Sequence, residues 1–587
     1  MLSWLQRRWF FAAAVCLGVL LVLPALDVGF VADDYMFIHR LDVQGRAASL
    51  RLYEFAEGKP GQHARLMSER WVTFPWWMSD NFKVRFVRPL SSGLFALDYA
   101  LFGRAPLGYH AHSLLWYAGM LAVVGAFLRR ICPAPTWQIA FLLFVLNAGH
   151  AECVAWLASR HVLVSSVPAL LGLLALIAYR ERGFRFGLPL ALLGLLLALL
   201  GGESVLIAVC YWLAYEAWGV ACSSLRQRAQ RLLLPLGFVA AYLLLYGRLG
   251  YGAAGSAAYL EPLSRAFWSQ LPRRLALLLG ELFTSFPSNL ALTTLPGLGS
   301  ALGAVATLAV ALGLRSMWPS LEAAERRCVL WLSAAGLAAL VSSAGAFLGS
   351  RLLLMPGIGG CVVVAIVLRH GWQRARSAAS VLGRRALVLV LVLVHVAVAP
   401  LLLVANCVLL RQLGLANLGV DTALDAHFQQ HRANGSQPPR VFVLAASDPF
   451  SAFYAGAVRV VRSPDSTAQW SLLSMARGTH RVERTAANKL VLSIDEGLLR
   501  STFEGLFRAA NQPFAVGDRA ELVGAHVTVL AVTEGRPTAI ELTLDSGSLD
   551  DASVCLLAWR EQRLVPVELS LHQALTIPWS PGPTGLL

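Results

Sequence analysis

The sequence predicts a polytopic α-helical membrane protein with about eleven transmembrane helices, followed by a soluble C-terminal domain that is β-rich or α+β. Of its 587 residues, 57% are hydrophobic and only 14% are charged, whereas a soluble domain carries about 25% charged residues. The apolar residues gather into runs long enough to cross a bilayer. Beyond about residue 410 these runs give way to a mixed, soluble pattern. The composition therefore excludes a wholly soluble or disordered chain.

Eleven apolar segments are predicted to cross the membrane. A crossing helix needs about 20 mostly apolar residues, so the third and fifth segments are expected to be tilted or broken. A further apolar stretch at 275–290 carries Glu281, which predicts a partly embedded or interfacial helix. The predicted spans are residues 10–26, 111–128, 136–149, 162–179, 187–201, 204–220, 232–247, 296–314, 328–348, 352–368 and 386–409.

The arginines predict the orientation in the membrane. The net charge of +15 is compatible with nucleic-acid binding, but the arginines lie in short clusters between apolar runs, a distribution typical of membrane topology. With Arg7 and Arg8 in the cytoplasm, five arginine clusters fall on that same side. Residues 27–110, 248–295 and everything after 410 then lie outside. We expect no nucleic-acid partner.

The first span and the overall composition indicate the location. A basic start followed by an apolar run resembles a secretory signal, but no small-x-small cleavage motif stands out. We expect an uncleaved anchor. Many arginines, only three lysines and no organellar signal favour a bacterial inner (plasma) membrane, with a cytoplasmic N-terminus and a periplasmic or extracellular C-terminal domain.

Two soluble regions are expected on the outer face. The loop 27–110 is rich in aromatic residues and is predicted to form amphipathic helices on the membrane or to cover a site. We divide the chain into a transmembrane catalytic domain, 1–410, and a soluble domain, 411–587. Alternating runs such as RVFVLAA at 440, VRVV at 458 and HVTVLAV at 526 predict strands in the soluble domain. Because it lacks a recognisable catalytic motif, we expect a lid or an acceptor-docking module.

Two adjacent carboxylates, Asp33 and Asp34, follow the first span directly. At the bilayer edge, in apolar and aromatic surroundings, two such charges are costly unless they are used or solvated. Burial and mutual repulsion are expected to raise at least one of the two pKa values, which suits a general base. The structural alternative is that they cap the next helix or lie in bulk water.

Further motifs follow the acid pair in a characteristic order. They are Arg88-Pro-Leu, Leu97-Asp-Tyr-Ala-Leu-Phe-Gly, Gly108-Tyr-His110, the segment from Gly149 to Arg160, and Ser350-Arg351-Leu-Leu-Leu-Met-Pro356. This order resembles that of the GT-C superfamily, integral-membrane glycosyltransferases that use polyprenyl-phosphate sugars and include protein O-mannosyltransferases and aminoarabinose transferases. The resemblance covers about residues 1–370 and implies the GT-C fold.

The resemblance implies an inverting glycosyltransferase that moves a sugar from a polyprenyl-phosphate donor to a protein, lipid or glycan acceptor outside the membrane. Asp33 is the implied base, and Asp34 assists it or binds the acceptor. Arg351 is expected to bind the donor phosphate, its alternative role being a snorkelling topology anchor.

Arg88 and Arg160 are further candidates for binding the phosphate, and the alternative for each is a structural ion pair with Glu152 or Asp98. The remaining candidates for an acceptor or substrate pocket are Tyr35, His110, His150, Glu152 and Glu203.

His150, Glu152 and His161 raise the question of a metal site, because two histidines and a carboxylate can bind zinc. Their spacing across a turn is not a recognised ligand spacing, so we assign no metal ligand and no certain cofactor. A divalent cation stays open because some GT-C enzymes use one.

Two other functions remain open at this level. A polysaccharide polymerase or O-antigen ligase uses polyprenyl-diphosphate glycans and relies on paired outer-loop arginines, which the acid pair disfavours. A transporter or flippase for lipid-linked sugars tends to show inverted repeats and interrupted helices near the midplane. We find no convincing repeat, and the titratable groups gather at the outer interface. The glycosyltransferase is favoured.

Overall fold

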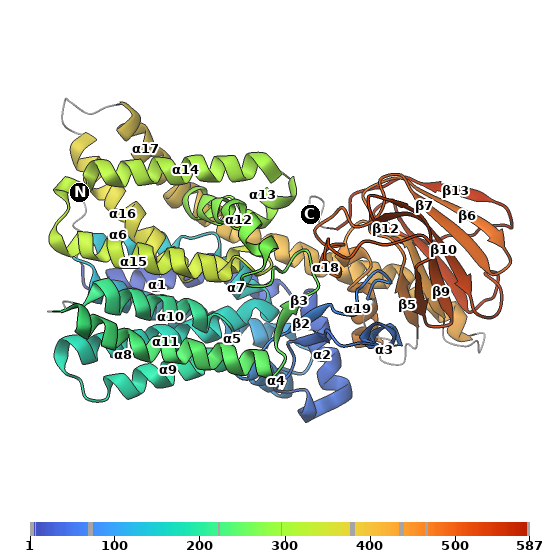
Figure 1. The fold of residues 1–587 in the computed structure, drawn as a ribbon, viewed down its shortest axis with the longest axis horizontal. Helices are drawn as coiled ribbons and strands as arrows, with labels where there is room; N and C mark the ends of the chain where they lie inside the picture. The colour runs from blue at the N-terminus through green and yellow to red at the C-terminus, as the bar shows by residue number, and fades with distance from the viewer. Residues whose placement is uncertain are drawn as a thin grey trace.

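The computed structural model consists of a helical membrane part and a β-rich C-terminal part, which lie next to each other along the long axis of the molecule (Figure 1). Most helices of the membrane part run roughly along that axis, and the sheets lie at one end of it. The structure describes residues 5, 7–68, 74–220, 224–294, 296–375, 382–433, 439–463 and 468–583.

Each predicted span falls on helical structure. The helices concerned are α1 (Phe10–Leu21) with η2 (Leu23–Asp27), α5 (Pro106–Ile131), α6 (Thr136–Val145), α8 (His161–Arg182), α9 (Gly187–Gly201), α10 (Val205–Ala214) with the π-turn η5 (Tyr215–Gly219), α11 (Leu225–Arg248), α14 (Pro296–Met317), α15 (Ala323–Ser343), α16 (Pro356–Ala375), and α17 (Leu382–Val392), which continues through the π-turn η8 (Leu393–Val398) into α18 (Ala399–Ala433).

The number of membrane crossings is a separate question from the number of helices. In the described part of the chain, six helical segments are long and apolar enough to cross a bilayer, and three shorter apolar helices accompany them. The six segments are Phe10–Asp27, Pro106–Ile131, Leu157–Arg182, Leu225–Arg248, Gly297–Ser320 and Gly383–Thr422. The expected total of about eleven crossings therefore stays a prediction.

The expected outer face is built from the segments between these helices. The first outer loop forms α2 (Asp33–Gln44), β1 (Glu54–Glu57), α3 (Gln62–Ser68), β2 (Lys83–Arg85) and α4 (Pro89–Phe102). Its strand β2 pairs with β1 and with β3 (Gly252–Ala254), so one antiparallel sheet ties two distant loops together. Other short elements are α7 (His150–Ala155), η4 (Leu157–Arg160), α12 (Arg265–Thr284), α13 (Ser288–Thr294) and η7 (Ser350–Leu353).

The C-terminal part contains two sheets. One is antiparallel with the strand order β13-β6-β7-β10-β9-β8, and in the other, β12-β11-β4-β5, the strand β4 runs parallel to both neighbours. The strands are β4 (Arg440–Ala445), β5 (Gln469–Leu472), β6 (His480–Ala486), β7 (Lys489–Ile494), β8 (Arg519–Leu522), β9 (Ala525–Thr533), β10 (Arg536–Leu544), β11 (Val554–Arg560), β12 (Arg563–Pro566) and β13 (Ala574–Ile577).

One predicted strand is wrong. The run VRVV at 458 lies in the helix α19 (Ala455–Arg462). Four residues of alternating polarity are too few to separate a strand from a helix. Here Arg459 is buried because it pairs with acids on α18. A tertiary contact thus decides the structure of this segment.

Two neighbouring tryptophans join the membrane part to the C-terminal part. The indole N–H of Trp76 donates to the carbonyl of Leu473 (3.0 Å), and that of Trp77 donates to the carbonyl of Glu504 (3.1 Å). Both indoles are buried. The helix α18 also runs unbroken through residue 410, so the expected domain boundary lies inside a helix. The first outer loop therefore packs directly against the C-terminal part.

Candidate functional site

A cavity of about 570 Å³ lies between the segments of the expected outer face and the ends of the long apolar helices. Four of the residues expected at the site line it together: Asp33, Arg88, Glu203 and Arg351. They come from α2, the start of α4, the turn before α10, and η7. The fold therefore brings two acids and two arginines that are far apart in sequence to a single space.

Asp33 is the first residue of α2 and faces this cavity. The residue before it, Ala32, has a positive φ of 53°, so the chain turns sharply between the first span and α2. The phenol of Tyr454 donates a hydrogen bond to Asp33 Oδ1 (2.9 Å). Burial raises the pKa of Asp33, while this hydrogen bond and the charges of Arg351 and Arg88 act in the opposite direction. A carboxyl group with a raised pKa is suited to accept a proton.

Asp34 lies in a different environment from its neighbour. Its side chain is fully buried and is not part of the cavity wall. One carboxylate oxygen accepts the N–H of Val31 and the other accepts the N–H of Ala158, both at 2.9 Å. Burial raises the pKa of Asp34 to about 8, and these two hydrogen bonds oppose the rise. Tyr35 is also buried outside the cavity wall.

Arg351 is held at the cavity by Glu152. The main-chain N–H of Arg351 donates to Glu152 Oε2 (3.0 Å), and its guanidinium group forms an ion pair with the same carboxylate. A third donor, Nη2, bonds to the carbonyl of Phe347 (3.1 Å). Glu152 itself is not part of the cavity lining. It therefore orients Arg351 from behind.

Arg88 reaches the cavity from the position before α4. Its Nε donates to Glu203 Oε2 (2.7 Å), and Glu203 also accepts the phenol of Tyr246 (3.1 Å). The guanidinium carbon lies over the rings of Tyr53 (4.7 Å) and Phe86 (4.5 Å). Within the described residues, the hydrogen bond of this guanidinium is made by Nε, which leaves both Nη groups for an anion.

Arg160 forms the structural ion pair that the sequence left open. It is buried, and its Nη2 lies 2.6 Å from Asp98 Oδ2. The other oxygen of Asp98 is 2.7 Å from Nδ1 of His112, and Arg160 Nη1 donates to the carbonyl of Tyr109 (3.2 Å). Arg160 does not line the cavity.

Two expected histidines also lie away from the cavity. Nε2 of His110 is 2.8 Å from the carbonyl of Gly29, and Nδ1 of His150 is 3.0 Å from the phenol of Tyr117. Both imidazoles are buried, and neither lines the cavity. In the part of the chain that the structure describes, no group of three or more His, Cys, Asp or Glu side chains is arranged to hold a metal ion.

Several residues at the cavity have no counterpart among the sequence-based candidates. Lys83 is one of only three lysines in the chain, and this scarcity is a signal that could have marked it. Tyr246 and Tyr259 line the cavity without belonging to any of the motifs. Tyr454 contacts Asp33 without being part of the cavity lining, and it gave no signal because it lies 421 residues from that aspartate.

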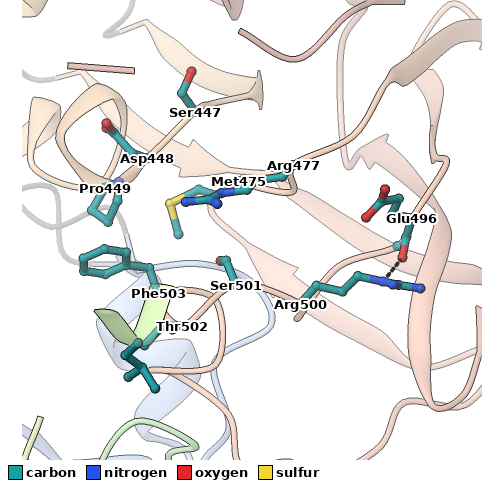
Figure 2. A pocket seen from close by; sticks show the side chains of 12 residues that line it. Ser447, Asp448, Pro449, Met475, Arg477, Glu496, Arg500, Ser501, Thr502 and Phe503 are labelled. Atoms are coloured by element: carbon teal, nitrogen blue, oxygen red, sulfur yellow. Dashed lines mark hydrogen bonds between the residues drawn. The ribbon is translucent and has the colours of Figure 1, made fainter. Parts of the chain in front are cut away.

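A second pocket, of about 310 Å³, lies in the C-terminal part and is shown in Figure 2. Its polar side chains include Arg477, Glu496 and Arg500, and the figure shows Arg500 bonded to the main chain of Glu496. None of the residues expected at the site lines this pocket. Its Phe503 packs against Phe347, with ring centroids 5.9 Å apart. Through Phe347 the pocket adjoins the surroundings of Arg351.

The chain is similar to several solved structures, three of which follow, while no family model and no curated protein matches it. An oligosaccharyltransferase of Archaeoglobus fulgidus tethered to an acceptor peptide is 12% identical, with a TM-score of 0.40, over 80% of this chain and 64% of that one. ArnT of Cupriavidus metallidurans bound to undecaprenyl phosphate is 15% identical, with a TM-score of 0.36, over 81% of this chain and 87% of that one. The arabinofuranosyltransferase AftD from Mycobacteria is 15% identical, with a TM-score of 0.36, over 92% of this chain and 42% of that one.

The chain thus spans less than two thirds of the oligosaccharyltransferase and less than half of AftD. At these TM-scores, the reaction and the roles of individual residues rest on the geometry of this chain alone. Two of the three are named as enzymes that transfer sugars, an oligosaccharyltransferase and an arabinofuranosyltransferase.

Proposed function

We propose that this protein transfers a sugar from a polyprenyl-phosphate donor to an acceptor on the outer face of a bacterial inner membrane, with inversion and with Asp33 as the general base. One observation carries the proposal: the carboxylate of Asp33 and the guanidinium groups of Arg88 and Arg351 line the same cavity. Transfer from a phosphate requires a base for the acceptor and cations for the leaving group.

The proposed reaction is a single displacement at the anomeric carbon. An acceptor oxygen or nitrogen bonds to that carbon while its proton passes to Asp33. The bond between the carbon and the phosphate oxygen breaks, and the polyprenyl phosphate leaves with one more negative charge. Because the phosphate is already a good leaving group, no acid catalyst is required.

The two arginines have complementary parts in this proposal. The Nη groups of Arg88 are suited to paired hydrogen bonds with phosphate oxygens. Arg351, held by Glu152, adds a second fixed positive charge where the negative charge develops. Preorganised cations of this kind stabilise a transition state without having to move during the reaction. The acceptor is a protein, a lipid or a cell-envelope glycan.

Mass spectrometry of co-purifying lipids tests the donor assignment. We expect a sugar-linked polyprenyl monophosphate with the detergent-solubilised wild type and a strong loss of it with Arg351→Ala. Arg129→Ala is the matched control, because Arg129 is exposed in the last turn of α5, and it should retain the lipid. A diphosphate-linked oligosaccharide would favour the polymerase or ligase instead. Absence of any polyprenyl lipid from all samples would contradict the assignment.

Asp33→Asn tests the base once the donor lipid is known. We expect the variant to keep the lipid and the thermal midpoint of the wild type, since the amide keeps the size of the side chain. Transfer should fall about 100- to 10,000-fold, the usual contribution of a general base. Transfer at a rate close to that of the wild type would show that Asp33 is not the base.

A further inference from the structure

The C-terminal part contributes a side chain that contacts the candidate base. The phenol of Tyr454 donates to Asp33 Oδ1 at 2.9 Å, and the two residues are 421 positions apart. Tyr454 lies between the short helix η9 (Pro449–Ser451) and α19. In Figure 1, α19 lies beside α2 where the two parts of the molecule meet. A residue of the predicted lid therefore contacts Asp33, which lines the cavity, although Tyr454 is not part of the lining itself.

Local structure fixes the direction of this phenol. Asp448 caps η9 by accepting the N–H of Ser451 (2.9 Å), and the N–H of Tyr454 donates to the carbonyl of Pro449 (3.1 Å). The ring of Tyr454 packs against that of Phe453, with centroids 4.9 Å apart. The side chain is thus supported both by the turn that carries it and by a neighbouring ring.

The helix that follows Tyr454 is tied to the membrane part by charged contacts. Arg459 lies 3.3 Å from Asp421 Oδ1 on α18 and also pairs with Asp425, and Arg462 lies 2.6 Å from Asp421 Oδ2. Arg104, between α4 and α5, donates to a carbonyl in the last turn of α19 (2.6 Å). These contacts hold α19, and Tyr454 with it, in one position relative to α2.

The hydrogen bond from Tyr454 gives the two carboxylate oxygens of Asp33 different roles. Oδ1 accepts the phenol, so Oδ2 is the oxygen left for an incoming proton. Hydrogen bonding to the charged form of an acid favours that form. The other charged or titratable groups around Asp33 are Arg351 on η7, Arg88 before α4, Asp34 on α2, and the phenols of Tyr53 and Tyr259.

We propose that Tyr454 is a positioning residue for the reaction: its O–H orients the Asp33 carboxylate towards the acceptor and keeps it ionised. The inference rests on the proposed function of Asp33 as the base. It assigns the C-terminal part a direct place in the active site, beyond covering the cavity or docking an acceptor. Tyr454 acts through Asp33 and does not exchange a proton with the substrate.

Tyr454→Phe in the full-length protein tests this role, with the co-purified donor lipid as substrate. The ring and its packing remain while the hydrogen bond is lost. Loss of this bond raises the pKa of Asp33, so the acidic limb of the rate profile should move up by about one pH unit. At a given pH on the acidic limb we expect kcat to fall about tenfold, and KM for the donor to stay within about twofold.

Tyr99→Phe is the matched control. Tyr99 also donates its phenol to an aspartate, Asp42, but that pair is outside the cavity lining. The control should keep the rate profile of the wild type, and thermal midpoints of both variants report any general loss of folding. An equal fall in kcat for both variants, without movement of the acidic limb, would overturn the positioning role.

The inference and the proposed function fail in different ways. If Asp33→Asn is inactive and Tyr454→Phe keeps the kcat and the pH profile of the wild type, the role of Tyr454 is refuted and the base assignment stands. If Asp33→Asn remains active, the base assignment is refuted, and the inference falls with it.

Discussion

Asp33 and Asp34 are adjacent in sequence, yet their carboxylates point into unlike environments. Asp33 lines the cavity and accepts a hydrogen bond from Tyr454, whereas Asp34 is fully buried and accepts two main-chain N–H groups. One of these groups belongs to Ala158, so Asp34 links the start of α2 to η4. The two acids therefore have separate expected roles, one in the reaction and one in holding the loop that presents it.

Asp34→Asn should mainly reduce stability. An amide accepts hydrogen bonds only at its oxygen, so one of the two buried N–H groups would face an NH2 group and stay unsatisfied. Such a loss costs about 1–3 kcal/mol. We expect a lower thermal midpoint for Asp34→Asn and an unchanged one for Asp33→Asn, measured by unfolding in the same detergent. The reverse order would contradict this division of roles.

Transfer should depend on pH through Asp33. Burial raises the pKa of this carboxyl group above that of an ordinary aspartate. Only the ionised form accepts a proton, so the rate is low below the raised pKa and increases as the pH rises through it. We expect an acidic limb in kcat/KM in the pH range above the ordinary pKa of an aspartate. A rate that is constant over this range, while the thermal midpoint is also constant, would argue against Asp33 as the base.

Arg88→Lys should weaken donor binding although it keeps the positive charge. Lysine lacks the planar fork that bonds to Glu203 and lies over two aromatic rings. We expect KM for the donor to rise about tenfold, because a lysine at this position cannot make the paired hydrogen bonds to phosphate oxygens proposed for the two Nη groups of Arg88. The measurement is the initial rate against donor concentration in mixed micelles.

Arg85→Lys is the control for this prediction. Arg85 also pairs with a glutamate, Glu54 (2.9 Å), and lies over the ring of Tyr251 (4.3 Å). It is not part of the cavity lining. An equal rise in KM for Arg85→Lys and Arg88→Lys would show that Arg88 does not act through the phosphate.

Asp421→Asn should loosen α19. The carboxylate of Asp421 is buried and pairs with both Arg459 and Arg462. Arg459 keeps its pair with Asp425, so the loss stays below the cost of about 3–5 kcal/mol for leaving a buried charge unpaired. The thermal midpoint should still fall, and kcat should fall because Tyr454 is held less firmly. Glu483→Gln, at an exposed pair with Arg481, should change neither quantity. Equal midpoints for the two variants would contradict the importance of the α18–α19 contact.

Much of the fold could be predicted because long apolar runs have few alternatives in a membrane protein. The segment predicted at 187–201 coincides with α9, and the run at 440 begins β4. The strand predicted for the four-residue run at 458 was wrong because so short a pattern fits both a strand and a helix. A contact with α18 decided in favour of the helix. The length of an apolar or alternating run, more than its residue types, therefore separated the correct predictions of secondary structure from this wrong one.

The site was less accessible to prediction because its contacts join distant segments. Asp33 could be found, since two acids beside an apolar span are conspicuous in the sequence. The partner of Arg160 could not be predicted, because Asp98 and Glu152 were equally plausible in the sequence. Only the packing of the helices distinguishes between them. Tyr454 is one of 13 tyrosines in the chain, and nothing in its local sequence sets it apart.

The continuous helix α18 has a mechanical consequence. Its 35 residues correspond to a rod of about 52 Å at 1.5 Å per residue, and it carries the last membrane segment without interruption into the C-terminal part. Because this rod is unbroken up to Ala433, the aspartates that pair with Arg459 of α19, Asp421 and Asp425, lie on the same rigid element as the last apolar segment.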